Sequence, residues 1–184
     1  MLTRRPSLGV SLLIFSLQIL LCMGGVATLA IVERGLSRWR DAQVMTGSLA
    51  PDFTLTSTTG NVYSLIALRG TPVLVTFGAS WCPACQREAP LLDAFAREYP
   101  QVAVFFVANE SDAGDVQGFK VDFDLDFAVL MDRDGTVTRS YRVSAYPTTF
   151  LIDTEGRIRQ RASLALLNGE LETLLPTIGL GGAR

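Results

Sequence analysis

Two cysteines separated by two residues, Cys82 and Cys85, are the part of this sequence best suited to chemistry. They follow an apolar run at 73–77 and open a segment at 83–99 that is typical of a helix. One turn of helix brings positions i and i+3 to the same face, so the two sulfurs can form a bond. The pattern therefore predicts a Cys82–Cys85 pair that exchanges disulfides with a partner.

The two cysteines are expected to have different roles. Cys82 would lie at or just before the first helical turn, where unpaired N–H groups and the helix dipole favour a thiolate. A lowered pKa makes Cys82 the expected attacking thiol, and Cys85, one turn deeper, the resolving thiol. The alternative is a metal site, but structural zinc needs about four N or S ligands. The sequence has no His and its third cysteine, Cys22, is distant, so a metal would need a dimer sharing four thiolates.

The composition excludes several classes of function. The 184 residues carry a net charge of −2, with 16 basic and 18 acidic side chains. No basic run extends beyond Arg4-Arg5, so we expect no nucleic-acid partner. Without His, histidine general-base catalysis and Cys-His proteolysis are absent. A globular part whose cysteines are a single pair fits an oxidising compartment.

A segment without charged side chains, residues 7–32, precedes the globular part. As a helix it would be about 40 Å long, enough to cross a hydrocarbon core of roughly 30 Å with some tilt. A cleaved signal peptide has an apolar stretch of about 7 to 15 residues. Although Gly25-Val26-Ala27 is a weak cleavage site, we expect residues 7–32 to be an uncleaved transmembrane anchor, with residues 1–6 in the cytoplasm.

The charges around this anchor do not orient it, because arginines lie on both sides, at 4 and 5 and at 34, 38 and 40. The redox motif instead favours an extracytoplasmic catalytic domain, in the periplasm or on the outer face of the cell membrane. Residues 33–46 would form a juxtamembrane linker, either as a short interfacial helix or as a loop.

Signals for strands and helices alternate from residue 51 onward. A strand–turn–strand pattern at 53–65 predicts a β-hairpin, and apolar runs at 72–77 and 101–108 predict buried strands. Helices are also expected at 83–99, 112–121, 137–143 and 166–178, and strands at 127–131, 148–152 and 158–163. Together they indicate an α/β fold over residues 47–178, with a mixed central sheet, helices on both faces and a flexible tail at 179–184. Asp132 and Asp134, before Gly135, are typical of a turn rather than of a calcium loop.

This order of motifs resembles the thioredoxin superfamily, and within it the membrane-anchored TlpA/ResA-like branch. The resemblance covers about residues 47–178, and rests on WCxxC after a strand, a helix with an internal Pro90, and Tyr146-Pro147 before an apolar strand. It implies a thioredoxin-like fold with a cis peptide bond before Pro147, a bond that proline makes accessible. The alternative for Pro147 is an ordinary proline at the start of a strand.

The resemblance also implies which residues contact the substrate. Tyr146 and Pro147 would flank the two sulfurs, and Trp81 and Pro83 would complete the contact surface. Because proline lacks an N–H group, the neighbouring backbone remains able to pair with an extended substrate strand.

Glu88 lies three residues after Cys85, so a helix places it near the resolving thiol. The resemblance implies that it accepts the proton of Cys85, since a partly buried carboxyl has a raised pKa. The alternative is a solvated helix charge. Two departures from thioredoxin affect this expectation. Thr76 stands where thioredoxin has a buried acid, so the proton route must differ, and Gly78 stands where a Trp is usual, a change that would open the floor of the site.

The sequence thus predicts a membrane-tethered thiol–disulfide oxidoreductase whose redox group is the Cys82–Cys85 disulfide, with no cofactor or metal. Its substrates would be disulfides of exported proteins, for example apocytochrome c, and a membrane electron-donor protein would re-reduce it. There is no Pro-x-x-x-Thr-x-x-Cys motif, which argues against a peroxiredoxin. The alternatives are a thiol oxidase running the same site in reverse and a metal- or copper-delivery module on a thioredoxin-like fold.

Overall fold

The structure is a computed structural model that describes residues 46–162, 173, 175–178 and 180. The predicted anchor at 7–32, nearly all of the linker at 33–46 and most of the tail at 179–184 lie outside the described residues. Among the residues that are described, no helix has both the length and the apolar character needed to cross a membrane. The helix predicted at 166–178 also lies mostly outside them, and its described end is the 3-10 turn η2 (Leu175–Ile178).

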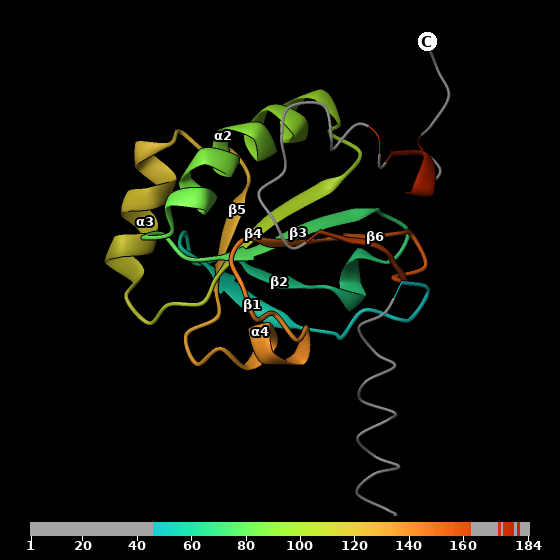
Figure 1. Cartoon of the computed structure of the whole chain (residues 1–184), viewed down its shortest axis with the longest axis horizontal. Helices are drawn as coiled ribbons and strands as arrows, with labels where there is room; N and C mark the ends of the chain where they lie inside the picture. Colours follow the sequence, from blue (N-terminus) through green and yellow to red (C-terminus); the bar gives the residue numbers. More distant parts are fainter. Residues whose placement is uncertain (1–45, 163–172, 174, 179, 181–184) are drawn as a thin grey trace, which may run out of the picture. The chain divides into compact units, whose positions relative to one another are not determined.

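A seven-stranded mixed sheet forms the centre of the described domain, in the order β2-β1-β5-β4-β3-β6-β7 (Figure 1). The central strands β3, β4 and β5 are parallel, and the other pairs are antiparallel. The strands are β1 (Thr54–Ser57), β2 (Val62–Ser64), β3 (Val73–Gly78), β4 (Ala103–Ala108), β5 (Ala128–Met131), β6 (Thr148–Ile152) and β7 (Ile158–Ala162). The predicted hairpin is β1–β2, which joins the sheet through β5, so the predicted mixed sheet is confirmed.

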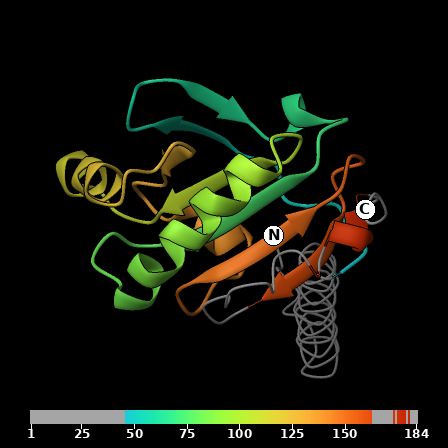
Figure 2. The same cartoon turned by 90° about the horizontal axis from the view of Figure 1, so that it is seen from above.

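Helices lie on both faces of the sheet, as predicted. The helices α2 (Pro83–Glu98) and α3 (Ala113–Asp122) cover one face, and α4 (Thr136–Ser140) lies on the other (Figure 1). Figure 2 shows α2 lying across the sheet, where it contacts β4. The short segment predicted as a turn or helix after β2 is the 3-10 helix η1 (Ile66–Leu68).

The sheet divides the core into two clusters, because successive residues of a strand point to opposite faces. On the α2 and α3 side, the ring of Phe106 packs against that of Phe119, with centroids 5.1 Å apart. On the α4 side, Phe77 and Phe150 pack around Tyr141, with ring centroids of Tyr141 4.8 and 5.1 Å from theirs. The near-continuous burial of β3 and β4 explains why their sequences are apolar runs rather than alternating patterns.

The helix boundaries follow from capping. Cys82 is the N-cap of α2 and Pro83 is its first residue, a position where the missing N–H group of proline costs no hydrogen bond. The helix continues through Pro90. The helix predicted at 112–121 begins one residue later, because Asp112 caps α3 by accepting a hydrogen bond of 2.7 Å from the N–H of Gly114.

A buried carboxylate ties α2 to the loop before β5. Asp93 is 6% exposed; it pairs with Arg97 at 2.7 Å and accepts the N–H of Asp126 at 2.7 Å. Its burial was not anticipated from the sequence, because its partners lie on its own helix and on a loop 33 residues away.

Candidate active site

The two cysteines meet at the start of α2, at the end of the strand β3. Cys82 is 6% exposed and Cys85 is fully buried, and both carry free thiols. The N–H of Cys85 donates to Sγ of Cys82 at 3.3 Å, so the sulfur itself caps the helix. The pair predicted from the spacing is therefore brought together, with Cys82 nearly covered and Cys85 fully buried.

The deeper thiol is held in its protonated form. Burial is the main cause that raises the pKa of Cys85 above its ordinary value. The hydrogen bond with Cys82 and the negative charges of Cys82 and Glu88 raise it further. A buried thiol of this kind must lose its proton to a neighbouring group before it can attack a disulfide.

Glu88 follows Cys85 by three residues on α2 and lies inside the core. Its side chain is 1% exposed, which rules out the solvated helix charge, and its Oε1 accepts a hydrogen bond from Oγ1 of Thr149 at 3.2 Å. Oγ1 of Thr149 is in turn 2.8 Å from Oγ1 of Thr76. Thr76, at the position where thioredoxin has a buried acid, is thus linked through one hydroxyl group to the carboxylate that the helix supplies.

Thr149 was not identified from the sequence. It reaches Thr76 because β3 and β6 are antiparallel and the two residues lie opposite each other in the register. Both therefore point to the same face of the sheet, the face that α2 covers. Neither the pairing of β3 with β6 nor its register can be read from the local pattern of either strand.

The floor of the site is closed at Gly78, contrary to the expectation that this glycine opens it. A Cβ atom at Gly78 would lie 2.5 Å from the ring of Phe106 and 2.8 Å from Sγ of Cys85. The missing side chain is therefore replaced by the Phe106 ring and the sulfur, which approach the bare backbone. Glycine is needed here for close packing rather than for access.

The peptide bond before Pro147 has the predicted geometry. The Tyr146–Pro147 peptide bond is cis, and Pro147 is buried directly before β6. The ring of Tyr146 lies 6.5 Å from that of Trp81, and its hydroxyl accepts a hydrogen bond of 2.6 Å from Nδ2 of Asn109. Tyr146 thus stands beside the cysteine loop, held by a residue that the sequence did not single out.

The exposed part of the site is small and aromatic. Trp81 is 66% exposed, and Pro83 is also exposed, whereas the sulfur between them is nearly covered. Cys82 therefore lies between two exposed side chains.

The loop that leads into Cys82 is clamped on both sides. The carboxylate of Glu110 accepts hydrogen bonds from the backbone N–H of Ser80 and, at 2.7 Å, from its hydroxyl group. Nε2 of Gln86 donates to the carbonyl oxygen of Ser80 at 2.8 Å. These contacts, made across 30 residues for Glu110, fix the chain directly before the reactive sulfur.

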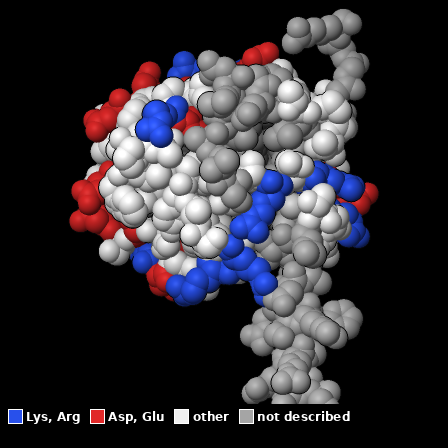
Figure 3. Space-filling model, viewed as in Figure 1, with Lys and Arg blue, Asp and Glu red and all other residues white. Residues whose placement is uncertain are grey.

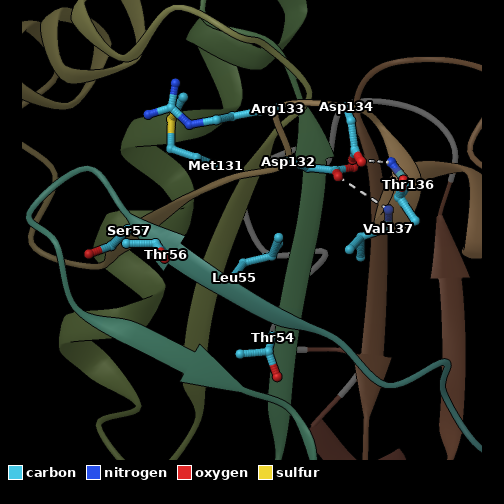
Figure 4. A pocket seen from close by; sticks show the side chains of 10 residues that line it. All are labelled: Thr54, Leu55, Thr56, Ser57, Met131, Asp132, Arg133, Asp134, Thr136 and Val137. Carbon is cyan, nitrogen blue, oxygen red and sulfur yellow. Dashed lines mark hydrogen bonds between the residues drawn. The ribbon is translucent and has the colours of Figure 1, made fainter.

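A hollow of about 430 Å³ lies apart from the cysteines, between β1 and the loop after β5 (Figure 4). Its buried carboxylate, Asp132, accepts hydrogen bonds from the N–H groups of Val137 and Thr138 at 3.2 and 2.7 Å. Asp134 likewise accepts the N–H of Thr136 at 2.9 Å. The carboxylates of this loop are used to begin α4, which confirms that they serve a turn.

Comparison with known proteins identifies relatives of the whole domain. A profile of the AhpC/TSA family matches residues 46–161. The thioredoxin-like protein YneN of Bacillus subtilis (strain 168) is 33% identical over 140 residues, which are 74% of this chain and 82% of that protein. The thiol-disulfide oxidoreductase ResA of Bacillus cereus (strain ATCC 10987 / NRS 248) is 29% identical over 168 residues, covering 90% of this chain and 96% of ResA.

A solved structure with a similar fold is described as a thiol:disulfide interchange protein DsbE from Chlorobium tepidum. It superimposes with a TM-score of 0.66 and 31% sequence identity, over 73% of this chain and 96% of that one. This structure and the two relatives each align with most of the described domain.

Proposed function

Since the chain belongs to the AhpC/TSA family and is a thioredoxin-like thiol–disulfide oxidoreductase, we propose that it reduces disulfides of exported proteins through Cys82 and Cys85. The observation that carries this proposal is the arrangement of the two free thiols. Cys82 caps α2 near the surface, and Cys85 lies buried one turn deeper, with its N–H group on the Cys82 sulfur.

The reaction proceeds in two exchanges. The Cys82 thiolate attacks one sulfur of the substrate disulfide, which forms a mixed disulfide and releases the other substrate sulfur as a thiolate. Cys85 then gives its proton to Glu88, and its thiolate attacks Sγ of Cys82. The second substrate sulfur leaves, the substrate has gained two electrons, and the domain holds a Cys82–Cys85 disulfide.

Four side chains would form the contact surface for the substrate. Trp81 and Pro83 are exposed and flank the reactive cysteine in the sequence, and Tyr146, which precedes Pro147, has its ring 6.5 Å from that of Trp81. An extended substrate strand can pair with the backbone beside Pro147, because peptide N–H and C=O groups are obligatory hydrogen-bonding partners.

The proposal includes a tether to the cell membrane. The alignment with ResA covers 90% of this chain, so it extends into the segment that precedes residue 46. That segment contains the uncharged residues 7–32, which as a helix are long enough to span a bilayer. The catalytic domain would then be extracytoplasmic, and apocytochrome c is one candidate substrate. A membrane protein would re-reduce the Cys82–Cys85 disulfide after each turnover.

A trapping experiment tests the pair and its order of reaction. In the full chain, Cys85→Ser is expected to accumulate a mixed disulfide with substrate proteins through Cys82, because the second exchange is removed. Cys82→Ser is the matched control and is expected to accumulate none. If Cys82→Ser traps partners and Cys85→Ser does not, the assigned roles are reversed.

The redox state in cells tests the direction. Cells are quenched in acid, and thiols are tagged with a heavy maleimide and counted on a gel, with Cys22 as an internal reference. Three tags mean that the pair is held reduced, as a reductase requires. One tag means that it is held oxidised, which would overturn the reductase in favour of a thiol oxidase.

A further inference from the structure

A second hollow borders the redox site. It has a volume of about 470 Å³ and runs between the cysteine loop and α3. Trp81 and Gln86 line it on one side, and Gly114, Gly118 and the ring of Phe119 line it on the other. We call this hollow the Trp81–α3 groove.

The Trp81–α3 groove lies next to the reactive sulfur, because two of the residues that line it are close to Cys82 in the sequence. Trp81 precedes Cys82 directly, and Gln86 lies one turn further along α2. A disulfide bond is about 2 Å long, so a substrate whose sulfur reaches Cys82 brings the residues beside its own cysteine close to Trp81. The groove is therefore within a few residues of any protein substrate's cysteine.

The glycines keep the groove open. Gly114 and Gly118 lie one turn apart on the same face of α3, and a Cβ atom at Gly118 would meet nothing within 4 Å. Two glycines in a helix of ten residues each cost about 1 kcal/mol relative to alanine. Because neither glycine has a side chain, this face of α3 leaves room for another chain.

The charged side chains that line the groove are all acidic. Asp115 and Asp122 line it and are exposed, and no Lys or Arg is among its lining residues. Residues 110–126 carry six acidic side chains and one basic one. That base, Lys120, donates to the backbone oxygens of Leu125 and Phe127. Figure 3 shows acidic side chains gathered on the side of the molecule where Figure 1 has α3.

The spacing of the two carboxylates suits an extended peptide. Asp115 and Asp122 are seven residues apart, so they lie on one face of α3 and about 10 Å apart along its axis. An extended chain rises about 3.3 Å per residue and covers that distance in about three residues.

We propose that the Trp81–α3 groove binds a basic, extended segment of the substrate protein next to its reactive cysteine, with Lys or Arg side chains facing Asp115 and Asp122. This inference rests on the proposed function, because it requires Cys82 to react with protein disulfides. Charges at the rim of an interface act mainly on the association rate and are screened by salt. The groove would therefore select among substrates by the rate at which they reach Cys82.

The test compares three disulfides with the reduced full chain. Two are peptides of the same length with one intramolecular disulfide, flanked by three Lys residues or by three Glu residues, and the third is the small neutral hydroxyethyl disulfide. Rates are followed by Trp fluorescence at low and high salt. The Lys peptide is expected to react about tenfold faster than the Glu peptide at low salt, and the ratio is expected to fall towards one at high salt.

Matched variants assign the effect to the groove. Asp115→Asn combined with Asp122→Asn is expected to remove most of the preference, whereas Glu98→Gln, at the far end of α2, changes it little. Gly118→Phe fills the groove and is expected to slow both peptides several-fold while leaving hydroxyethyl disulfide unchanged. Val121→Phe places the same side chain at an exposed position of α3 outside the groove lining; it is the matched control and is expected to retain the wild-type rates.

The outcomes separate the two proposals. Equal rates for the Lys and Glu peptides, or a preference that survives in the double Asn variant, overturn the groove. A preference lost equally in Glu98→Gln also overturns it, since net charge alone would then explain the rates. If hydroxyethyl disulfide does not react, or reacts equally well with Cys82→Ser, the proposed function itself fails.

Discussion

The two faces of the central sheet have different tasks although the same strands build both. On the α2 side, alternate residues of β3 and β6 bring Thr76 and Thr149 to the carboxylate of Glu88 beneath the cysteines. On the α4 side, their neighbours Phe77 and Phe150 pack against each other with ring centroids 5.8 Å apart. A shift of one residue in register would exchange the two sets.

The residues expected to take part in the reaction thus lie on one face of the sheet, and residues that contribute mainly to stability lie on the other. Polar groups in the core are tolerated on the α2 side because each of the two threonine hydroxyls has a hydrogen-bond partner. Variants on that face should change rates, even where, as for Thr149→Val, they also lower stability, and variants on the α4 face should change the free energy of unfolding alone. Five predictions test this separation.

The largest effect is expected from Cys82→Ser. Loss of the attacking thiolate should lower the rate of disulfide reduction by at least about a thousandfold. Serine is a good N-cap, so the free energy of unfolding should change by less than about 1 kcal/mol. Reduction assays and urea unfolding of the reduced protein measure the two quantities, and a large loss of stability would contradict the separation.

Glu88→Gln should slow the resolution of the mixed disulfide by about a hundredfold, the order expected for loss of a proton-transfer group. The pKa of Cys85, which burial chiefly raises, should fall, because the negative charge of Glu88 also raises it. Stopped-flow measurements between pH 6 and 9 give the rate of resolution. Thiol alkylation in the Cys82→Ser background gives the pKa of Cys85. Glu98→Gln on the same helix is the control, and identical rate profiles for the two variants would exclude proton transfer by Glu88.

Thr149→Val should have an intermediate effect on both the resolution of the mixed disulfide and the free energy of unfolding. The change removes the hydroxyl that links Thr76 to Glu88, at a cost of about 1–3 kcal/mol in the free energy of unfolding. The pH profile of resolution should shift, which simple loss of packing would not cause. Thr149→Ser keeps the hydroxyl group and should restore the wild-type profile; if it does not, the hydrogen bonds have no role in positioning Glu88.

Tyr141→Phe tests the opposite face. Tyr141 is fully buried, and its hydroxyl donates to the carbonyl oxygen of Pro51 at 2.8 Å. Its removal should cost about 1 kcal/mol in the free energy of unfolding and leave the reduction rate unchanged. Thermal or urea unfolding beside a rate measurement checks this, and a rate that falls with the stability would show that the two faces are coupled.

The smallest effect is a dependence of stability on pH. The folded-state pKa of Cys85 is raised above its ordinary value of 9.0, mainly by burial, so its contribution to stability is present below that pH and is lost as pH rises above it. The reduced protein should therefore lose stability relative to the disulfide form above about pH 9. Burial also raises the pKa of Tyr141. Tyr141 is present in both the reduced and the disulfide form, so its effect on stability cancels when the two forms are compared. The prediction would be wrong if the free energy of unfolding of the reduced form and that of the disulfide form changed with pH in the same way.

Most of the fold was predictable from local sequence. The β3 run, the helix opened by Cys82 and Pro83, and the hairpin β1–β2 each follow from periodicity, capping and turn residues, and their boundaries were predicted to within a few residues. Local spacing likewise predicted that Glu88 follows Cys85 by about one turn of the same helix. The spacing of Cys82 and Cys85 predicted the redox pair, whereas the expected cis bond before Pro147 needed the resemblance to a known family.

The tertiary structure decided what surrounds that pair. The link from Thr76 through Thr149 to Glu88 joins residues 73 and 61 positions apart, and the clamp of Glu110 on Ser80 joins residues 30 apart. The closed floor at Gly78 depends on a ring from β4, and the Trp81–α3 groove depends on how a helix packs beside the cysteine loop. Local sequence determines backbone preferences and periodicity, whereas these contacts depend on strand register and helix packing, which are fixed only when distant segments meet.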